Sequence, residues 1–271
     1  MATFNNNMTM DEIVDFSQLS TEELPTMEQF NRTVGAWKFR SQANRRYKLL
    51  TLCADTSASM NHRMDGRKTR LMVMNEQLLS LLRAPAIQAE ADLTYVCIIT
   101  FGGDTVQTVM EYTLLSEIDL DALAAKLPRV GKGMTPMGGA VLKAVDMGIA
   151  MRKTLRARSE RSYANIAVLF TDGGANDTED MKKAQDKVDF MLDSSAMQLL
   201  CFGISEEAEF DQLTKLLRND RHGNGSGGKA DIICNAEQAS KAMVKVVLTT
   251  LAAAQNGNNL PLVSRNSTIG A

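Results

Sequence analysis

From residue 48 onward, short apolar runs alternate with amphipathic stretches. The runs at residues 48–54, 93–101, 165–170 and 197–204 are bounded by polar or small residues, which is typical of buried strands. Between the first two runs, residues 67–83 place apolar side chains at helical spacing, namely Leu71, Met74, Leu78 and Leu81. Alternating strands and helices of this kind predict an α/β domain with a mainly parallel sheet.

The remaining pattern completes this fold. Residues 105–112 alternate after the tight turn at 102–104, which predicts a hairpin and one antiparallel edge strand. Thr135-Pro136 opens a long helix with Pro136 at the first helical position. Further helices are expected at 119–127, 178–191, 206–217 and 236–254, and a last strand at 231–234. The predicted fold is a doubly wound, mostly parallel six-stranded sheet with helices on both faces.

The chain divides into three parts by composition. Residues 1–45 are rich in Asn, Thr, Glu and Met, with short helices expected near 9–17 and 26–33. We interpret them as an extension packed along the domain, and a segment that docks a partner is the alternative. Residues 46–255 form the α/β domain, with a flexible Gly-rich loop at 221–228, and residues 256–271 form a polar, flexible tail.

Oxygen-bearing side chains follow the first strand. Asp55, Ser57 and Ser59 occupy alternate positions, so an extended loop presents all three on one side. Hard cations such as Mg²⁺ select oxygen ligands, and Mg²⁺ takes about six of them. One loop cannot supply six oxygens, so other loops are expected to contribute.

Two later loops supply further oxygens. Thr135 lies in the Gly-rich stretch 131–139, and Asp172 follows the apolar strand at residues 166–170. Each residue has a simpler interpretation, because Ser and Thr commonly cap helices and Asp-Gly commonly forms turns. The occurrence of all five residues at three strand ends favours a metal site.

These three motifs together resemble the metal-ion-dependent adhesion site of von Willebrand factor A (VWA) domains, and the resemblance extends over residues 47–251. It implies the strand order 3-2-1-4-5-6, with all three loops on one rim. It also implies that Ser57, Ser59 and Thr135 reach the ion directly or through water. Asp55 and Asp172 would act mainly through water, and Asp55 would also order the serines. The expected ion is Mg²⁺, with Mn²⁺ or Ca²⁺ as alternatives, and a protein partner would supply an acidic side chain as the last ligand.

Composition narrows the functional classes. The chain is 44% hydrophobic and 23% charged with a net charge of -2, which gives no general indication of nucleic-acid binding. No apolar run has the length of a membrane span, and the first residues lack the pattern of a secretory signal. Cys53, Cys97 and Cys201 fall in expected strands as buried thiols, which favours a cytoplasmic location.

Three further polar side chains, His62, Asp104 and Lys132, lie near the motifs in the sequence. His62 is interpreted as an exposed loop residue rather than a ligand, because oxygen-rich Mg²⁺ sites rarely recruit imidazole. Asp104 either supports the site from a distance or only forms a turn, and Lys132 either attracts an acidic partner or is simply solvated.

A basic stretch at residues 152–161 closes the long helix, where cations favour the helix dipole. No aromatic side chains interleave with its charges, which disfavours nucleic-acid binding. In position, this stretch resembles that of bacterial VWA proteins of tellurite-resistance and stress loci. Those are often encoded beside protein kinases and PP2C-type phosphatases.

The leading hypothesis is a non-enzymatic, metal-dependent protein-binding module in a bacterial stress-response or signalling complex. One alternative is a Mg²⁺-dependent phosphatase of the haloacid-dehalogenase type, which needs a second Asp two residues after the nucleophile, where Ser57 stands. Another is an RNA-binding VWA module similar to Ro-type proteins, which the near-neutral charge disfavours.

Overall fold

The structure is a computed structural model that describes residues 46–64, 67–194, 196–204 and 229–233, together with the single positions 213, 216 and 247. The strands are β1 (Arg46–Asp55), β2 (Thr94–Gly102), β3 (Thr105–Leu114), β4 (Arg161–Thr171), β5 (Met197–Ile204) and β6 (Lys229–Ile233). The α-helices are α2 (Arg70–Arg83), α3 (Pro85–Gln88), α4 (Leu120–Lys126), α5 (Met137–Ala157) and α6 (Thr178–Asp193). Short 3-10 helices lie at η2 (Ala58–Asn61), η3 (Ala91–Leu93) and η4 (Leu115–Glu117).

The strands form one sheet in the order β3-β2-β1-β4-β5-β6, which is the order that the resemblance implied. Only β3 runs antiparallel, paired with β2, and the other neighbours are parallel. The predicted fold class is therefore confirmed. Because β1, β2, β4 and β5 are parallel, the loops that follow their carboxyl ends meet at one edge of the sheet.

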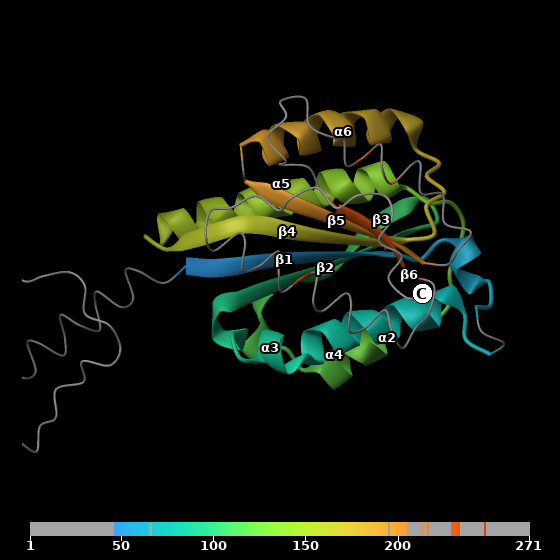
Figure 1. Ribbon diagram of the computed structural model, residues 1–271, viewed down its shortest axis with the longest axis horizontal. Coiled ribbons are helices and arrows are strands. Elements are labelled where there is room, and N and C mark those ends of the chain that lie inside the picture. Colours follow the sequence, from blue (N-terminus) through green and yellow to red (C-terminus); the bar gives the residue numbers. More distant parts are fainter. Residues whose placement is uncertain are drawn as a thin grey trace, which may run out of the picture. The chain divides into compact units, whose positions relative to one another are not determined.

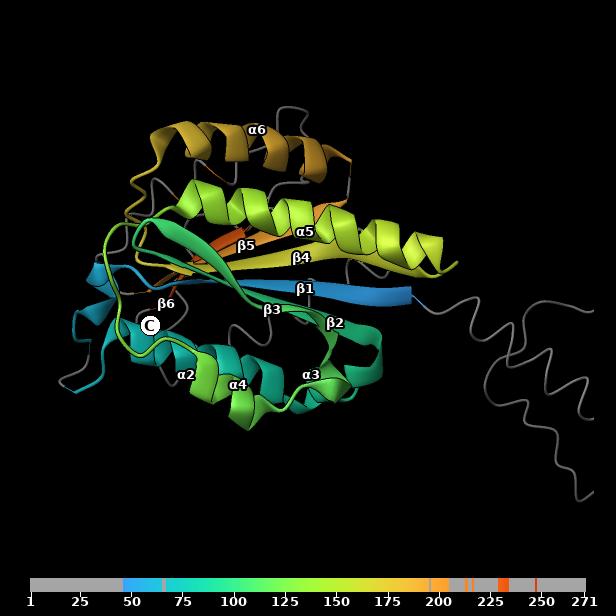
Figure 2. The same cartoon turned by 180° about the vertical axis from the view of Figure 1, so that it is seen from behind.

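Helices cover both faces of this sheet. Figures 1 and 2 show α5 and α6 on one face and α2, α3 and α4 on the other. In β1, Leu50 and Leu52 pack with the α2 side of the core, whereas Cys53 packs with the α5 side. A strand buried on both faces reads as a continuous apolar run, which is why the sequence predicted it. Cys53, Cys97 and Cys201 are buried free thiols, as predicted, and burial raises the pKa of each.

Some element ends differ from the prediction. Helix α5 begins at Met137, so Pro136 precedes the helix instead of opening it. Strand β4 begins at Arg161 and not near 165, because backbone pairing with β1 starts at Arg46 and Arg161, ahead of the apolar run. Helix α2 ends at Arg83, and Pro85 then starts the separate short helix α3, where a missing N–H costs nothing.

Several predictions lie outside the described residues. These are the helices at 9–17, 26–33, 206–217 and 236–254, apart from single helical positions in the last two, and the loop at 221–228. The boundaries at residues 45 and 255 also stay predictions. In the described part of the chain, no helix combines the length and hydropathy needed to cross a bilayer.

Candidate metal centre

Asp55 ends β1 and is fully buried at the rim of the sheet. Its Oδ1 accepts the backbone N–H of Ser57 at 2.7 Å, and its Oδ2 accepts the hydroxyl of Thr171 at 2.6 Å. Burial raises the pKa of the Asp55 carboxyl to about 6, although the bonds from Thr171 and Ser57 favour the charged form. The Asp55 carboxylate therefore fixes the position of the loop that begins at Thr56, through its bond to the Ser57 N–H.

Ser57 and Ser59 present their hydroxyls side by side. Ser57 is buried, and its Oγ lies 3.0 Å from the Oγ of the half-exposed Ser59. Ser57 is the N-cap residue of the 3-10 helix η2, and Ser59 lies within that helix, so the two hydroxyls lie on the same side. The two hydroxyls thus form a pair, but the loop is not extended throughout as the sequence predicted, because Ser59 lies in a 3-10 helix.

The Gly-rich loop lies directly against the serine loop. The N–H of Ala58 donates to the carbonyl of Gly133 at 3.1 Å, and the N–H of Lys132 donates to the carbonyl of Thr56 at 2.8 Å. A Cβ on Gly131 would stand 2.0 Å from the Ser57 carbonyl oxygen, so only glycine permits this approach. The absence of a side chain at Gly131 therefore allows the two loops to pack backbone against backbone.

The side chain of Asn61 strengthens the same junction. Its amide nitrogen donates to the carbonyl of Gly131 at 2.8 Å, and its Oδ1 accepts the N–H of Gly131 at 2.8 Å. Two loops that are far apart in sequence are therefore joined by backbone bonds and by this paired contact.

Thr135 is held by the third loop. It is buried, its N–H donates to Oδ1 of Asn176 at 2.9 Å, and its carbonyl accepts the N–H of Asn176 at 3.1 Å. The carboxylate of Asp177 accepts the N–H groups of Gly138 and Gly139 at 3.1 and 2.8 Å and so caps helix α5. The N-cap position of α5 is Pro136 and not Thr135, so the simpler interpretation of Thr135 as the helix cap does not hold.

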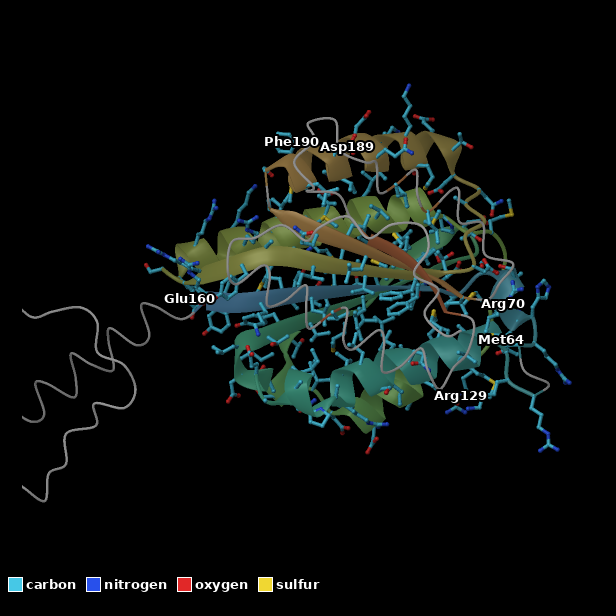
Figure 3. All side chains as sticks on the ribbon, viewed as in Figure 1. Met64, Arg70, Arg129, Glu160, Asp189 and Phe190 are labelled. Carbon is cyan, nitrogen blue, oxygen red and sulfur yellow. The ribbon has the colours of Figure 1, made fainter. Side chains whose placement is uncertain are left out.

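Asp172 forms an ion pair that the sequence did not indicate. Its Oδ2 lies 3.0 Å from Nη1 of Arg70, and both side chains are more than nine-tenths buried. Arg70 is the first residue of α2, on the helix that packs beneath the rim. Figure 3 labels Arg70 and Met64 at this end of the sheet, and Glu160 at the opposite end.

The candidate site is a pocket of about 350 Å³ at this rim. Its lining residues are Ser59, His62, Arg70, Gly133, Thr135, Asp172, Gly174 and Asn176. Asp55 and Ser57 lie beneath it and connect to it through the hydrogen bond to Ser59. All five residues predicted from the motifs therefore meet at one place. His62 is exposed at the mouth of the pocket, as predicted.

Asp104 and Lys132 lie beside this pocket and not in it. Both are exposed, and both line a neighbouring hollow of about 360 Å³ between the β2–β3 turn and the Gly-rich loop. Asp104 forms part of the turn between the two strands. Neither side chain contributes an atom to the candidate site.

The donor set fits a hard divalent cation. It offers two carboxylates and three hydroxyls, all of them oxygen, from three loops. Among the described residues there is no group of three His, Cys, Asp or Glu side chains that could hold an ion, so the hydroxyls are an essential part of this set. Arg70 already partly neutralises Asp172, so a cation bound here would share that carboxylate with a guanidinium.

Four residues of this centre escaped the sequence analysis, namely Arg70, Thr171, Asn176 and Asp177. Arg70 lies in the amphipathic stretch at residues 67–83, where the hydropathy pattern gives no sign of a buried ion pair. Asp177 occupies the N-cap position of α6, but its side chain makes no cap bond there and caps α5 instead. The clustering of Asn, Asp and Thr after Gly173-Gly174 was the one available signal.

Comparison with known proteins places this geometry in context. The model of the von Willebrand factor type A domain family matches residues 50–247. The manganese-loaded TRAP protein of Plasmodium vivax has a TM-score of 0.51 and 16% identity, with 75% of this chain and 72% of that chain covered. The SpRpn10 VWA domain has a TM-score of 0.54 and 13% identity, with 74% and 95% covered. The pilus adhesin SpaC of Lactobacillus rhamnosus GG has a TM-score of 0.57 and 12% identity, with 78% and 31% covered.

A short local match to an enzyme is of a different kind. Acetylglutamate kinase of Mycolicibacterium vanbaalenii is 41% identical over 63 residues, which cover 23% of this chain and 21% of the kinase. The chain thus spans about a fifth of the length of the curated relatives it matches. A match this short does not extend the kinase's activity to this chain.

The family match, in contrast, covers most of the sheet and all three rim loops. VWA domains are commonly modules for protein interaction, usually bind a divalent metal and are generally not enzymes. The chain belongs to the von Willebrand factor type A domain family.

Proposed function

We propose that this protein is a metal-dependent protein-binding module, in which Asp55, Ser57, Ser59, Thr135 and Asp172 hold one divalent cation. The observation that carries the proposal is the convergence of three loops on one pocket of about 350 Å³, which Ser59, Thr135 and Asp172 line. Asp55 and Ser57 are linked to this pocket by hydrogen bonds through Ser59. The ion is Mg²⁺ in the first instance, with Mn²⁺ or Ca²⁺ as alternatives, because the donors are all oxygen.

The partner contributes an acidic side chain. Both oxygens of Asp55 already accept hydrogen bonds from Ser57 and Thr171, and Oδ2 of Asp172 is paired with Arg70. These contacts support carboxylates that act on the cation largely through water. A bound ion would then supply an electrophilic coordination position toward the solvent, which suits a carboxylate from outside. Arg70 adds a second positive group that favours the same incoming charge.

Exposed apolar side chains beside the pocket support protein docking. Val130 is 61% exposed and lines the neighbouring hollow, just before the Gly-rich loop. Met134 is 53% exposed and directly precedes Thr135. A carboxylate–metal contact contributes strongly only when surrounding groups exclude water. These two side chains, together with His62 at the mouth of the pocket, would form that surrounding surface, whereas Met60 is buried in the core.

Calorimetric titration with Mg²⁺ and Mn²⁺ tests the metal site. We expect one site, weakened at least tenfold by Thr135→Val, because this isosteric change removes only a hydroxyl. Thr105→Val is the matched control, since Thr105 is exposed on β3 and outside the pocket. Undiminished binding by a Ser57→Ala/Thr135→Ala double variant would refute the ligand assignment.

Affinity capture tests the partner. A partner should be retained with Mg²⁺, released by EDTA and lost with Asp55→Ala, with Asp104→Ala as an exposed acidic control. Because Asp55 is buried, circular dichroism must show that the variant is folded. A partner retained equally in all conditions, but lost on deletion of residues 1–45, would move the function away from the metal.

The biological setting is a finer proposal. The partner would belong to a cytoplasmic bacterial stress-response or signalling complex, as a protein kinase or a PP2C-type phosphatase. Its support is the resemblance to tellurite-resistance and stress-type VWA proteins at residues 152–161. Identification of the captured proteins by mass spectrometry tests this, and capture of unrelated proteins alone would contradict it.

A further inference from the structure

A second pocket, of about 600 Å³, lies at the other end of the sheet. Its lining residues are Arg46, Arg152, Arg156, Ser159, Glu160, Arg161 and Ser162. Arg46 begins β1, whose ten residues end at Asp55, so the two pockets are separated by roughly 30 Å along the strand. Figure 3 labels Glu160 at this end and Arg70 at the metal end. The two pockets are therefore separate sites.

The pocket concentrates positive charge from three elements. Arg152 and Arg156 come from the last turns of α5, Arg46 from the start of β1 and Arg161 from the start of β4. With Glu160 as the one acidic lining residue, the formal charge of the lining is +4 − 1 = +3. Within the described residues, none of the four guanidinium groups forms an ion pair with a carboxylate.

The helix dipole does not explain this cluster. The dipole favours cations at the carboxyl end of α5, so it accounts for Arg152 and Arg156 only. Arg46 and Arg161 belong to strands, and they are direct partners in the β1–β4 pairing. Like charges opposite each other across two strands are destabilising, so a structural role alone would disfavour arginine at both positions.

The arginines are partly fixed by neighbouring groups. The guanidinium of Arg46 lies over the ring of Tyr163 at 5.6 Å, and Nη1 of Arg152 donates to the carbonyl of Ala196 at 3.1 Å. Oε1 of the lining residue Glu160 accepts the hydroxyl of Tyr47 at 3.3 Å. Burial, and secondarily Arg156, lower the pKa of Arg152, as expected for cations held close together.

Ser159 adds a backbone observation. It has a φ of 60°, the one positive value at a non-glycine residue in the described part of the chain. Glycine is the usual residue in this conformation after a helix. A serine here places a hydroxyl on the pocket wall despite the conformational strain, and Ser162 at the start of β4 supplies another.

We propose that this pocket, defined by Arg46, Arg152, Arg156 and Arg161, binds a compact ligand with two or more linked phosphate groups. Guanidinium groups match phosphate oxygens with paired hydrogen bonds, and the two hydroxyls donate to the same oxygens. The volume of about 600 Å³ exceeds the need of one phosphate and lies in the range of small-molecule sites. The lining offers arginines and hydroxyls instead of an apolar surface, which favours an oligophosphate over a carboxylate with an apolar body.

Calorimetry on the full chain, with EDTA present so that the metal site cannot contribute, tests the proposal with tripolyphosphate as the probe. We expect one site that weakens at higher salt, and a loss of about tenfold or more in Arg156→Gln and in Arg161→Gln. Arg158→Gln is the matched control. It removes the same charge two residues after Arg156, but the Arg158 side chain does not line the pocket. Its affinity should stay within about twofold.

Parallel titrations separate the sources of the phosphate. Pyrophosphate and ATP should bind at the same site and compete with tripolyphosphate, whereas inorganic phosphate should bind at least tenfold more weakly. Ser159→Gly gives an independent test, because it should raise the melting temperature by relieving the backbone while weakening tripolyphosphate binding. The proposal would be overturned if tripolyphosphate did not bind, or if Arg156→Gln and Arg158→Gln lost the same affinity for it. Binding to anionic lipid vesicles alone would also overturn it.

Discussion

The ion pair between Arg70 and Asp172 gives the sharpest test of the metal centre. The substitution Arg70→Gln removes a buried cation that shares the Asp172 carboxylate with the proposed metal ion. We expect two opposite effects. The protein without metal should become less stable, because Asp172 loses its partner, and the affinity for Mn²⁺ should rise, because the competing charge is gone.

The magnitudes follow from burial and distance. Nη1 and Oδ2 are 3.0 Å apart, with the two side chains 8% and 6% exposed. Removing one partner of such a buried pair costs about 3–5 kcal/mol. A unit charge and a divalent ion ~6 Å apart repel by about 5 kcal/mol at an effective dielectric constant of ~20, before the side chain rearranges. If only a quarter of that repulsion remains, its removal tightens metal binding about tenfold.

Urea unfolding in EDTA and in excess Mn²⁺ measures both effects. Ligand stabilisation grows as RT ln(1 + [L]/Kd), so a tenfold lower Kd adds ~1.4 kcal/mol at the same saturating concentration. The variant should therefore lose about 3–5 kcal/mol in EDTA and regain at least ~1.4 kcal/mol more than the native chain on addition of Mn²⁺. Arg67→Gln is the control, because Arg67 is exposed and three residues earlier in the chain.

The result that would refute this reasoning is a metal-induced stabilisation that is equal or smaller in Arg70→Gln. Calorimetric titration gives the Mn²⁺ affinity directly and separates it from the loss of stability. If Arg67→Gln changed the affinity as much as Arg70→Gln, the effect would be a general one of net charge.

Three further predictions concern the same rim. The pKa of Asp55 is about 6 in the fold, above its ordinary value of ~3.9. The protonated carboxyl therefore stabilises the fold fully below pH ~4, and this contribution is lost as the pH rises through about 6. The free energy of unfolding should fall by roughly 3 kcal/mol over this range. Urea unfolding in EDTA should show this fall, Asp55→Asn should flatten it, and Mn²⁺ affinity should rise over the same range as the carboxyl ionises. Gly131→Ala should weaken Mn²⁺ binding at least tenfold by calorimetry, since its Cβ would collide with Ser57, whereas at Gly139 the nearest atom is 3.3 Å away and Gly139→Ala should have little effect. The protein with Mg²⁺ should not hydrolyse generic phosphomonoesters, and turnover abolished by Asp55→Asn would instead support the phosphatase alternative.

Local patterns were sufficient for most of the sheet. The apolar runs that predicted β1, β4 and β5 lie inside the observed strands, and the run for β2 starts one residue early, at Leu93 in η3. These runs were recognisable because each strand is buried on both faces and its apolar pattern is continuous. The errors lie at element ends, as at Arg161 and Pro136, where backbone hydrogen bonding and not side-chain burial determines the boundary.

The candidate ligands were likewise visible in the sequence. Asp55, Ser57 and Ser59 follow one strand directly, and Thr135 and Asp172 occupy loops with clear local signals. Because parallel strands bring their carboxyl ends to one edge, a correct fold class already implied that these loops meet. The sequence could not indicate how Asp55 and Asp172 are paired within the protein.

Only the tertiary structure brought together groups that are distant in the chain. Arg70 and Asp172 are separated by 102 positions, and Asp177 caps α5 across a gap of 39 residues. The basic pocket likewise depends on the pairing of β1 with β4, which sets Arg46 beside Arg161 near the end of α5. Hydropathy and spacing report the environment of neighbouring residues, whereas contacts between charges depend on strand order and helix placement, which no local pattern encodes.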